Sequence, residues 1–178
     1  MVAESEAYPN GESMVLIMAG SGFAMSVRDQ GVFVAGRHGW AGELGSNVYP
    51  YHGEIRALDK ISGGYAILEA AGCPVEALLA ALERDEEWAK AIIEEAGHYF
   101  GLALVDVLHS FNPEVLVVGG STATYKGYME AAVRTAEAYT YPAIWQDCRI
   151  VRPQDPKRIV ALGARLFAFR QHQAGGQD

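Results

Sequence analysis

The sequence predicts an α/β fold in which a parallel sheet is covered by helices. Two continuous apolar runs, 14–19 and 115–118, have the length and composition of strands that are buried on both faces. The long stretch between them, 58–112, has apolar side chains at helical spacing. After the second run, a helical pattern is followed by a third short strand at 148–151, an alternation typical of parallel strands joined by crossover helices.

The first part of the chain, 14–57, is predicted to be rich in strands and follows a polar leader at 1–13. Its first strand ends where glycines begin at Gly20. The segments 24–28 and 32–35 then flank a turn that ends in Gly31. Glycine in a short connection between two strand-like segments predicts a β-hairpin.

A glycine-rich loop follows the hairpin at 36–45 and contains four glycines. Glycine is costly to order, so this density indicates positive φ or close backbone approach. The single carboxylate of the loop, Glu43, lies between Gly42 and Gly45 and can be presented to a small polar ligand without crowding. Spacing alone favours the alternative, a tight surface loop. The next residues, 47–56, show no clear period.

The middle of the chain, 58–112, is predicted to be a helical block. The expected helices are 58–71, which ends at Gly72, then 74–84, and a long helix that is capped by Asp85 and runs to Ser110. Apolar stripes are expected to face the core; they contain Leu58, Ile61, Tyr65 and Leu68 in the first helix, and Trp88, Ile92, Ala96, Tyr99, Ala103 and Val107 in the long one.

The last part, 113–170, is predicted to be a β-α-β-α unit, followed by a frayed tail at 171–178. Its expected elements are a strand at 115–118, a helix at 125–139, a strand at 148–151 and a helix at 155–169. The whole chain, 1–178, is interpreted as a single domain.

The composition excludes several classes of function. A net charge of −8 argues against nonspecific nucleic-acid binding, which needs clustered lysine and arginine. The two cysteines, Cys73 and Cys148, form no Cys-x-x-Cys pair, and this usage suits a reducing cytosol. No apolar run approaches the roughly 20 residues that cross a bilayer. We therefore expect a cytoplasmic protein with no membrane contact.

Glycines follow both of the long buried strands. After the first strand come Gly20, Ser21 and Gly22, the first glycine turn, whose amides and hydroxyl could converge on a phosphate. After the second come Gly119 and Gly120, the second glycine turn, which allows close approach of a nucleotide. Both follow the carboxyl ends of strands, where α/β sheets bind ligands. Purely structural turns remain the alternative for each.

These motifs, in this order, resemble the C-terminal part of the ROK family, which groups bacterial sugar kinases with sugar-responsive transcriptional repressors. The matching segments are 19–22, 36–45, 58–64, 112–120 and 160–164, so the resemblance covers nearly all of the chain. It implies one lobe of the actin-like, hexokinase-like (ribonuclease H-like) ATPase fold with an inserted helical block.

The resemblance also implies roles for individual residues. Glu43, beside Gly42, would hydrogen-bond sugar hydroxyls, and Asp59 would take the place of a second sugar-binding glutamate, although a solvated helix cap is the ordinary explanation for Asp59. Ser46 stands where the family usually has a histidine that binds zinc or contacts the sugar. Gly20, Ser21 and Gly22 would face nucleotide phosphates, and Gly119 and Gly120 would lie by the adenosine.

The chain also departs from the family pattern. No cysteine occurs at 47–56, where the family has a cysteine-rich zinc loop, so no metal is expected. The family's Asp-x-Gly-Gly-Thr strand and Asn-Asp catalytic pair have no counterpart. Sugar phosphorylation needs a base within reach of the attacking hydroxyl and a metal-held triphosphate. This chain alone is therefore predicted to be inactive and to require no cofactor; ATP and magnesium would serve only the complete kinase.

Three functions stay open. The first is the sugar-sensing half of a ROK-type regulator, or a relative that binds sugar without phosphorylating it. The second is the C-terminal lobe of an ATP-dependent, glucokinase-like hexose kinase. The third is a truncated structural remnant. The expected partners are a small carbohydrate and a second copy of the chain, because a lobe without its partner lobe should expose an apolar face.

Overall fold

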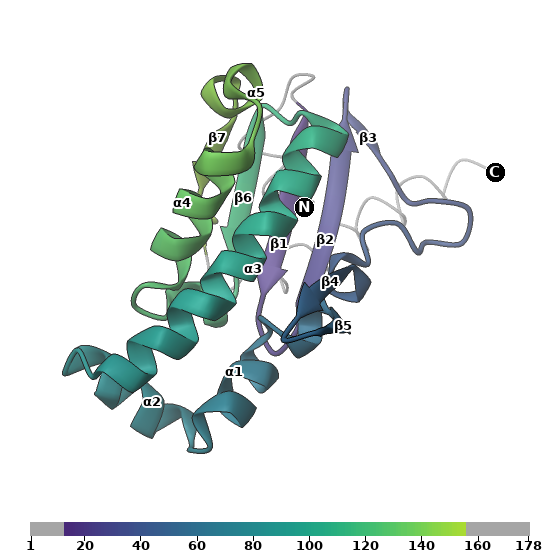
Figure 1. Cartoon of the computed structure of the whole chain (residues 1–178). Helices are drawn as coiled ribbons and strands as arrows, with labels where there is room; N and C mark the ends of the chain where they lie inside the picture. Colours follow the sequence, from purple (N-terminus) through teal and green to yellow (C-terminus); the bar gives the residue numbers. More distant parts are fainter. Residues whose placement is uncertain (1–12, 156–178) are drawn as a thin grey trace.

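The computed structural model describes residues 13–155, and its centre is a five-stranded mixed sheet (Figure 1). The strand order is β3-β2-β1-β6-β7, in which β1 is antiparallel to β2 and parallel to β6, and β6 is parallel to β7. The strands are β1 (Met14–Ala19), β2 (Phe23–Asp29), β3 (Val32–Phe33), β6 (Val115–Gly119) and β7 (Arg149–Val151). The predicted α/β class and the parallel pairing of the later strands are confirmed.

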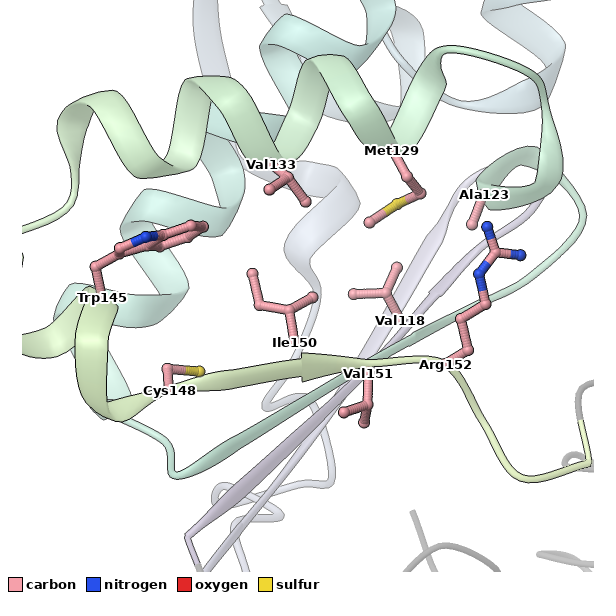
Figure 2. Close-up of a pocket in the computed structure, with 9 residues that line it drawn as sticks. All are labelled: Val118, Ala123, Met129, Val133, Trp145, Cys148, Ile150, Val151 and Arg152. Atoms are coloured by element: carbon pink, nitrogen blue, oxygen red, sulfur yellow. The ribbon is translucent and has the colours of Figure 1, made fainter.

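Two helices, α3 (Glu87–Phe111) and α4 (Tyr128–Tyr139), pack against each other and against one face of the sheet. Figure 2 shows side chains of α4 directed toward those of β6 and β7 across this contact. A short helix, α5 (Pro142–Asp147), connects α4 to β7. The sequence analysis did not predict α5, because six residues are too few to reveal a helical period.

Two glycines of α3 let α4 approach closely. A Cβ atom on Gly97 would lie 2.6 Å from the carbonyl oxygen of Tyr128, and one on Gly101 would lie 2.6 Å from that of Ala132. Real side-chain carbons do not come so near a carbonyl oxygen, so the helix spacing at this crossing depends on glycine.

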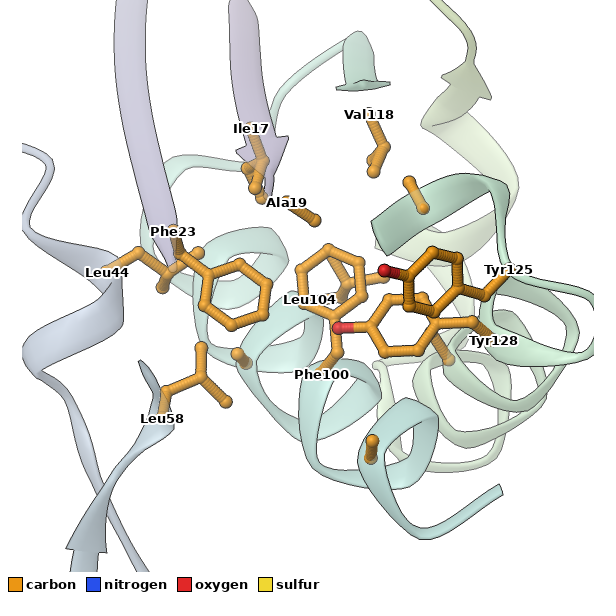
Figure 3. Close-up of a cluster of buried hydrophobic side chains, with 14 of the residues drawn as sticks. Ile17, Ala19, Phe23, Leu44, Leu58, Phe100, Leu104, Val118, Tyr125 and Tyr128 are labelled. Carbon is orange, nitrogen blue, oxygen red and sulfur yellow. The ribbon is translucent and has the colours of Figure 1, made fainter. Parts of the chain in front are cut away.

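The core lies between the sheet and these helices (Figure 3). An aromatic stack crosses it: the ring centroids of Phe23 and Phe100 are 5.1 Å apart, and those of Phe100 and Tyr128 are 5.6 Å apart. Because strand side chains alternate between faces, the other face of the sheet carries a second buried cluster. Its fully buried or nearly buried members are Met14, Leu16, Val115 and Val117.

The helix predicted at 58–71 starts later than expected. Its first residues form a separate 3-10 turn, η3 (Leu58–Lys60), and α1 (Gly64–Ala71) begins after it, followed by α2 (Val75–Glu83). Tyr65, predicted on the buried stripe, is 75% exposed because the register changes between the turn and the helix. No single helix among the described residues is long and apolar enough to span a membrane; the stretches Leu58–Ala71 and Val75–Glu83 meet the length and hydropathy criteria only together, across a 92° bend.

The start of the long helix also differs from the prediction. Asp85 has a positive φ of 56°, and Glu86 is the N-cap, so the predicted cap was one residue early. Trp88 is 43% exposed rather than buried, because it lies in the first turn, where its indole N–H donates a hydrogen bond to Glu86 at 2.6 Å. Ala96, Ala103 and Val107 of the predicted stripe are buried as expected. Phe100 and Leu104, which were not predicted, are buried beside them.

The segment 47–56, for which no element was predicted, forms most of a second, two-stranded sheet. Its strands are β4 (Val48–Tyr51) and β5 (Glu54–Ala57). The Tyr49 hydroxyl donates a 2.5 Å hydrogen bond to Asp106 of α3, and the Tyr99 hydroxyl of α3 donates one of 2.8 Å to the Pro50 carbonyl oxygen. The hairpin is therefore held to the long helix by tyrosines.

The predicted helix at 125–139 likewise begins after a 3-10 turn, η4 (Thr122–Thr124), so that α4 starts at Tyr128. A further short turn, η2 (Leu44–Ser46), ends the glycine-rich loop. The leader up to residue 12, the predicted helix from 156 onward, the motif at 160–164 and the tail lie outside the described residues.

Candidate functional site

The two glycine turns lie at the same edge of the sheet. In the parallel β1–β6 pair, Met18 is opposite Gly119, so both strands end at this level. Gly120 has a φ of 100°, and a Cβ atom there would lie 2.2 Å from the carbonyl oxygen of Ala19. Only glycine fits so close to the end of β1, and the second turn is consequently packed beside the first.

The first glycine turn is joined to α1 and η4 through the carbonyl oxygen of Gly20. This oxygen accepts hydrogen bonds from the Gly64 amide at 2.8 Å and from Oγ1 of Thr122 at 2.7 Å. The Gly20 amide itself donates to the Gly22 carbonyl oxygen at 2.9 Å, so it is not available to a phosphate. Within residues 13–155, the amides of Ser21 and Gly22 donate no hydrogen bond to a backbone carbonyl oxygen.

Asp59 lies where the first glycine turn meets the glycine-rich loop. Its Oδ1 accepts a 2.8 Å hydrogen bond from the Phe23 amide at the start of β2. Cβ atoms built on Gly22 and Gly45 would lie 2.8 Å and 2.1 Å from that oxygen. The half-buried carboxylate is therefore framed by two glycine backbones. It does not act as a side-chain cap, and α1 starts at Gly64 with Gly63 as its N-cap.

The glycine-rich loop runs along β2. The Met25 amide donates to the Gly42 carbonyl oxygen at 3.1 Å, and a Cβ atom on Gly42, whose φ is 101°, would lie 2.3 Å from the Met25 carbonyl oxygen. Beyond Gly42, the exposed Ser46 donates its amide to the Glu43 carbonyl oxygen at 3.0 Å. The loop is thus a defined backbone structure in which Gly42 is required.

Glu43 is exposed and lines a cavity of about 320 Å³ between the loop, β2 and the C-terminal half of α3. Other polar residues on its wall are Asn47, Asp106 and Ser110. Asp59 is not among the lining residues. The structure therefore brings Glu43 together with Asp106, and Asp59 together with the glycines, rather than placing both predicted carboxylates in one of the described cavities.

Asp106 was missed by the sequence analysis, since a carboxylate on a helix resembles a solvated surface residue. Asp106 accepts the hydrogen bond of the Tyr49 hydroxyl, and this contact affects the pKa of Tyr49. Burial is the main cause that raises this pKa above its usual range, and the Asp106 carboxylate is the second. Tyr49 consequently remains a neutral hydrogen-bond donor at physiological pH. Thr122 was also missed, and no local pattern marks it.

Metal ligands do not gather anywhere in residues 13–155. No group of three or more His, Cys, Asp or Glu side chains there could hold an ion. His52, which follows the glycine-rich loop in the sequence, has its Nε2 atom 3.0 Å from Oε1 of Glu95 of α3. That the protein uses no zinc stays a prediction.

Comparison with solved structures defines the class of fold. A ROK hexokinase from Thermus thermophilus superimposes with a TM-score of 0.81 at 24% identity, over 97% of this chain and 63% of that one. A ROK family transcriptional regulator, described as a homologue of the Escherichia coli Mlc protein, superimposes with a TM-score of 0.76 at 25% identity, over 93% of this chain and 48% of that one. The chain accordingly has the fold of one lobe of an actin-like ATPase, as predicted.

The family follows from the sequence. The model of the ROK family matches residues 2–171, and the chain belongs to that family. Among curated proteins, the N-acetylmannosamine kinase of Salmonella paratyphi B is 25% identical over 140 residues, which is 72% of this chain and 48% of the kinase. The chain thus spans about half the length of the curated relatives that it matches.

Proposed function

We propose that this chain is a carbohydrate-binding lobe, the sugar-sensing half of a ROK-type regulator or of a relative that binds sugar without phosphorylating it. The observation that carries the proposal is the Asp59 carboxylate, held by the Phe23 amide between Gly22 and Gly45. A carboxylate fixed in this way retains lone pairs for ligand hydroxyls, and small-ligand sites use a few such oriented polar groups.

The exposed Glu43 of the glycine-rich loop would supply a second carboxylate, with Gly42 and Ser46 beside it. Loop closure by a bound sugar would have to bring Glu43 and Asp59 toward one ligand. The names of the relatives support a sugar as that ligand, because they include an N-acetylmannosamine kinase and a hexokinase. Their substrates are expectations for this chain.

A sensing role is favoured over catalysis by the residues themselves. Asp59 stands where the resemblance implies a glutamate, and this shorter side chain suits a site that is not under strict catalytic demand. Ser46, in the position of the family's usual histidine, cannot coordinate zinc as an imidazole does.

The second candidate function is the C-terminal lobe of a sugar kinase, and the adjacency of the two glycine turns favours it. The amides of Ser21 and Gly22 are directed to no acceptor within residues 13–155 and could receive phosphate oxygens. Gly119 and Gly120 would then lie by the nucleoside. Bound ATP and magnesium would supply the transferable phosphoryl group, while these residues would only position it.

Calorimetric titration of the chain with glucose, N-acetylglucosamine and N-acetylmannosamine tests the main proposal. Binding of one sugar is expected, with a loss of about tenfold or more in affinity for Asp59→Asn and Glu43→Ala, since a hydrogen bond to a charged group is lost in each. The exposed carboxylates Asp147 and Glu137 provide matched controls as Asp147→Asn and Glu137→Ala.

Heat from none of the sugars, or equal affinities in all four variants, would refute the proposal. Titration with a nonhydrolysable ATP analogue separates the alternatives: binding that is lost in a Gly120→Ala variant supports the kinase lobe. If the chain binds neither sugar nor nucleotide, the result supports the third alternative, a structural remnant.

A further inference from the structure

A second cavity, of about 370 Å³, lies between β6 and β7 below and α4 above (Figure 2). This volume is within the range of small-ligand sites. Val118 and Ile150 form its floor, Met129 and Val133 of α4 its roof, and Trp145 of α5 one end. The wall is therefore apolar along most of its length, and none of the residues implied by the family resemblance lines it. We call it the β7 pocket.

The one charged residue of the β7 pocket is Arg152, at the end opposite Trp145. Side chains alternate along a strand, so Cys148, Ile150 and Arg152 follow one another on the pocket side of β7, over roughly 13 Å at the usual rise per residue. Figure 2 shows the Arg152 guanidinium near Ala123, while Val151 points away.

The guanidinium of Arg152 is exposed and makes no hydrogen bond or ion pair within residues 13–155. Its planar group matches a carboxylate, with which it can form two parallel hydrogen bonds. The position and the unused donors of Arg152 therefore give the pocket a preference for an anionic group at this end only.

Cys148 does not add a second polar end. Burial is the main cause that raises the pKa of its thiol to about 11, so the sulfur stays protonated at neutral pH and behaves as an apolar surface. A sugar would leave most of its hydroxyls without partners among these residues, and a nucleobase would leave its polar edge without them.

We propose that the β7 pocket binds a small amphipathic monocarboxylate, a medium-chain acyl or aromatic acid, with the carboxylate on Arg152 and the apolar body extended between α4 and β7 toward Trp145. This ligand site is separate from the proposed carbohydrate site, and it would give the protein a second small-molecule input. Occupation of the pocket would brace α4 and α5 against the sheet edge.

Calorimetric titration of the whole chain with octanoate tests the inference, with octylamine as the cationic probe of equal chain length. Saturable octanoate binding is expected, and octylamine should bind about tenfold more weakly or not at all. Arg152→Gln should weaken octanoate binding about tenfold without changing that of octylamine. Arg149→Gln is the control: Arg149 is on the same edge strand, lies 3.4 Å from Glu114, and should change octanoate affinity by less than about twofold.

A second variant examines the apolar end. Val133→Trp should fill the space below α4 and abolish octanoate binding, and circular dichroism verifies that the variant is folded. If that variant does not fold, Arg152→Gln, at an exposed position, still decides the question. Asp59→Asn should leave octanoate affinity unchanged, so a failure of the sugar proposal and a failure of this one are distinguishable.

Three results would overturn the inference. The first is the absence of saturable octanoate binding. The second is equal affinity for octanoate and octylamine, or no effect of Arg152→Gln, which would mean that no anion is recognised. The third is competitive displacement of octanoate by AMP, which would assign the pocket to a nucleotide.

Discussion

At the scale of single residues, Asp59 and Gly45 depend on each other. The Asp59 carboxylate occupies the space that a Cβ atom on Gly45 would need, and it also accepts the Phe23 amide. This contact joins the start of β2 to the glycine-rich loop. A change at either residue therefore affects both the backbone and the orientation of the candidate ligand group.

Gly45→Ala should lower the free energy of unfolding by about 1–3 kcal/mol, because the new methyl group displaces the carboxylate and leaves the Phe23 amide without its acceptor. Urea unfolding followed by circular dichroism measures this. Gly20→Ala is the matched control, since among the described residues the Cβ position meets no atom nearer than the Gly22 carbonyl oxygen at 4.0 Å.

A double-mutant cycle sharpens the prediction. In an Asp59→Ala background the acceptor is already absent, so Gly45→Ala should have little further effect. An equal loss of stability from Gly45→Ala in both backgrounds would show that the two residues are not coupled and would contradict this account.

Some contacts of the candidate residues could be predicted from the sequence, and others could not. The proximity of Gly20 and Gly120 could be predicted, because parallel strands end at a common edge of a sheet. The contact of Asp59 with Gly45 could not, since it joins two 3-10 turns, η3 and η2, that lie far apart in the sequence and that no short-range pattern connects. That Glu43 and Asp106 line the same cavity was hidden for a similar reason: nothing local distinguishes a helical carboxylate that faces a cavity.

At the scale of elements, the β4–β5 hairpin shows which kinds of strand can be predicted from the sequence and which cannot. The buried strand at 14–19 was predicted because it is continuously apolar. In β4, Pro50 interrupts the strand pattern, and the tyrosines on either side of it contact α3 through hydroxyl hydrogen bonds and through edge contacts with the Tyr99 ring. Such a strand is stabilised by side-chain hydrogen bonds to a distant helix, which no short-range pattern reports.

Two buried tyrosines, Tyr49 of this hairpin and Tyr128 of α4, predict that the free energy of unfolding depends on pH. The folded-state pKa values of Tyr49 and Tyr128 are both raised above the ordinary value near 10, mainly by burial. Above that pH the unfolded chain loses phenolic protons that the folded chain keeps. Stability from this source is therefore complete below about pH 10 and declines as the pH rises further.

Urea unfolding at a series of pH values up to pH 11 should show this decline, and Tyr49→Phe should make it shallower. Tyr65, which is 75% exposed, gives the control variant Tyr65→Phe, for which the parental slope is expected. Identical slopes for the parent and Tyr49→Phe would exclude Tyr49 as a source of the effect.

At the scale of the whole molecule, exposed apolar side chains gather at one edge of the sheet. Val32 and Trp40 are 69% and 74% exposed, and the Ala41 amide donates to the Ala35 carbonyl oxygen at 3.2 Å, which returns the loop to the end of β3. Within residues 13–155, β3 is an edge strand with one strand neighbour, and an edge with exposed apolar residues favours pairing with another chain. The long helix α3 is an alternative contact surface between copies, and it exposes its large apolar residues only near its ends, at Trp88 and Phe111.

Sedimentation velocity distinguishes these two surfaces. We expect the chain to self-associate, and Trp40→Ser should shift it toward the monomer while Trp88→Ser leaves the distribution unchanged. The opposite result would assign the contact to the long helix, and a parental chain that is monomeric at all concentrations would exclude self-association.

The parallel pairing of β1 with β6 also affects how the chain is made. Met14 pairs with Val115, so the β1–β2 hairpin leaves the ribosome long before β6, the parallel partner of β1, has been synthesised. Until then the growing polypeptide exposes an apolar strand edge, the kind of surface that chaperones cover. Productive folding must therefore await translation of β6, and a pause introduced between the codons for α2 and β6 would prolong the period in which the nascent chain is prone to aggregate.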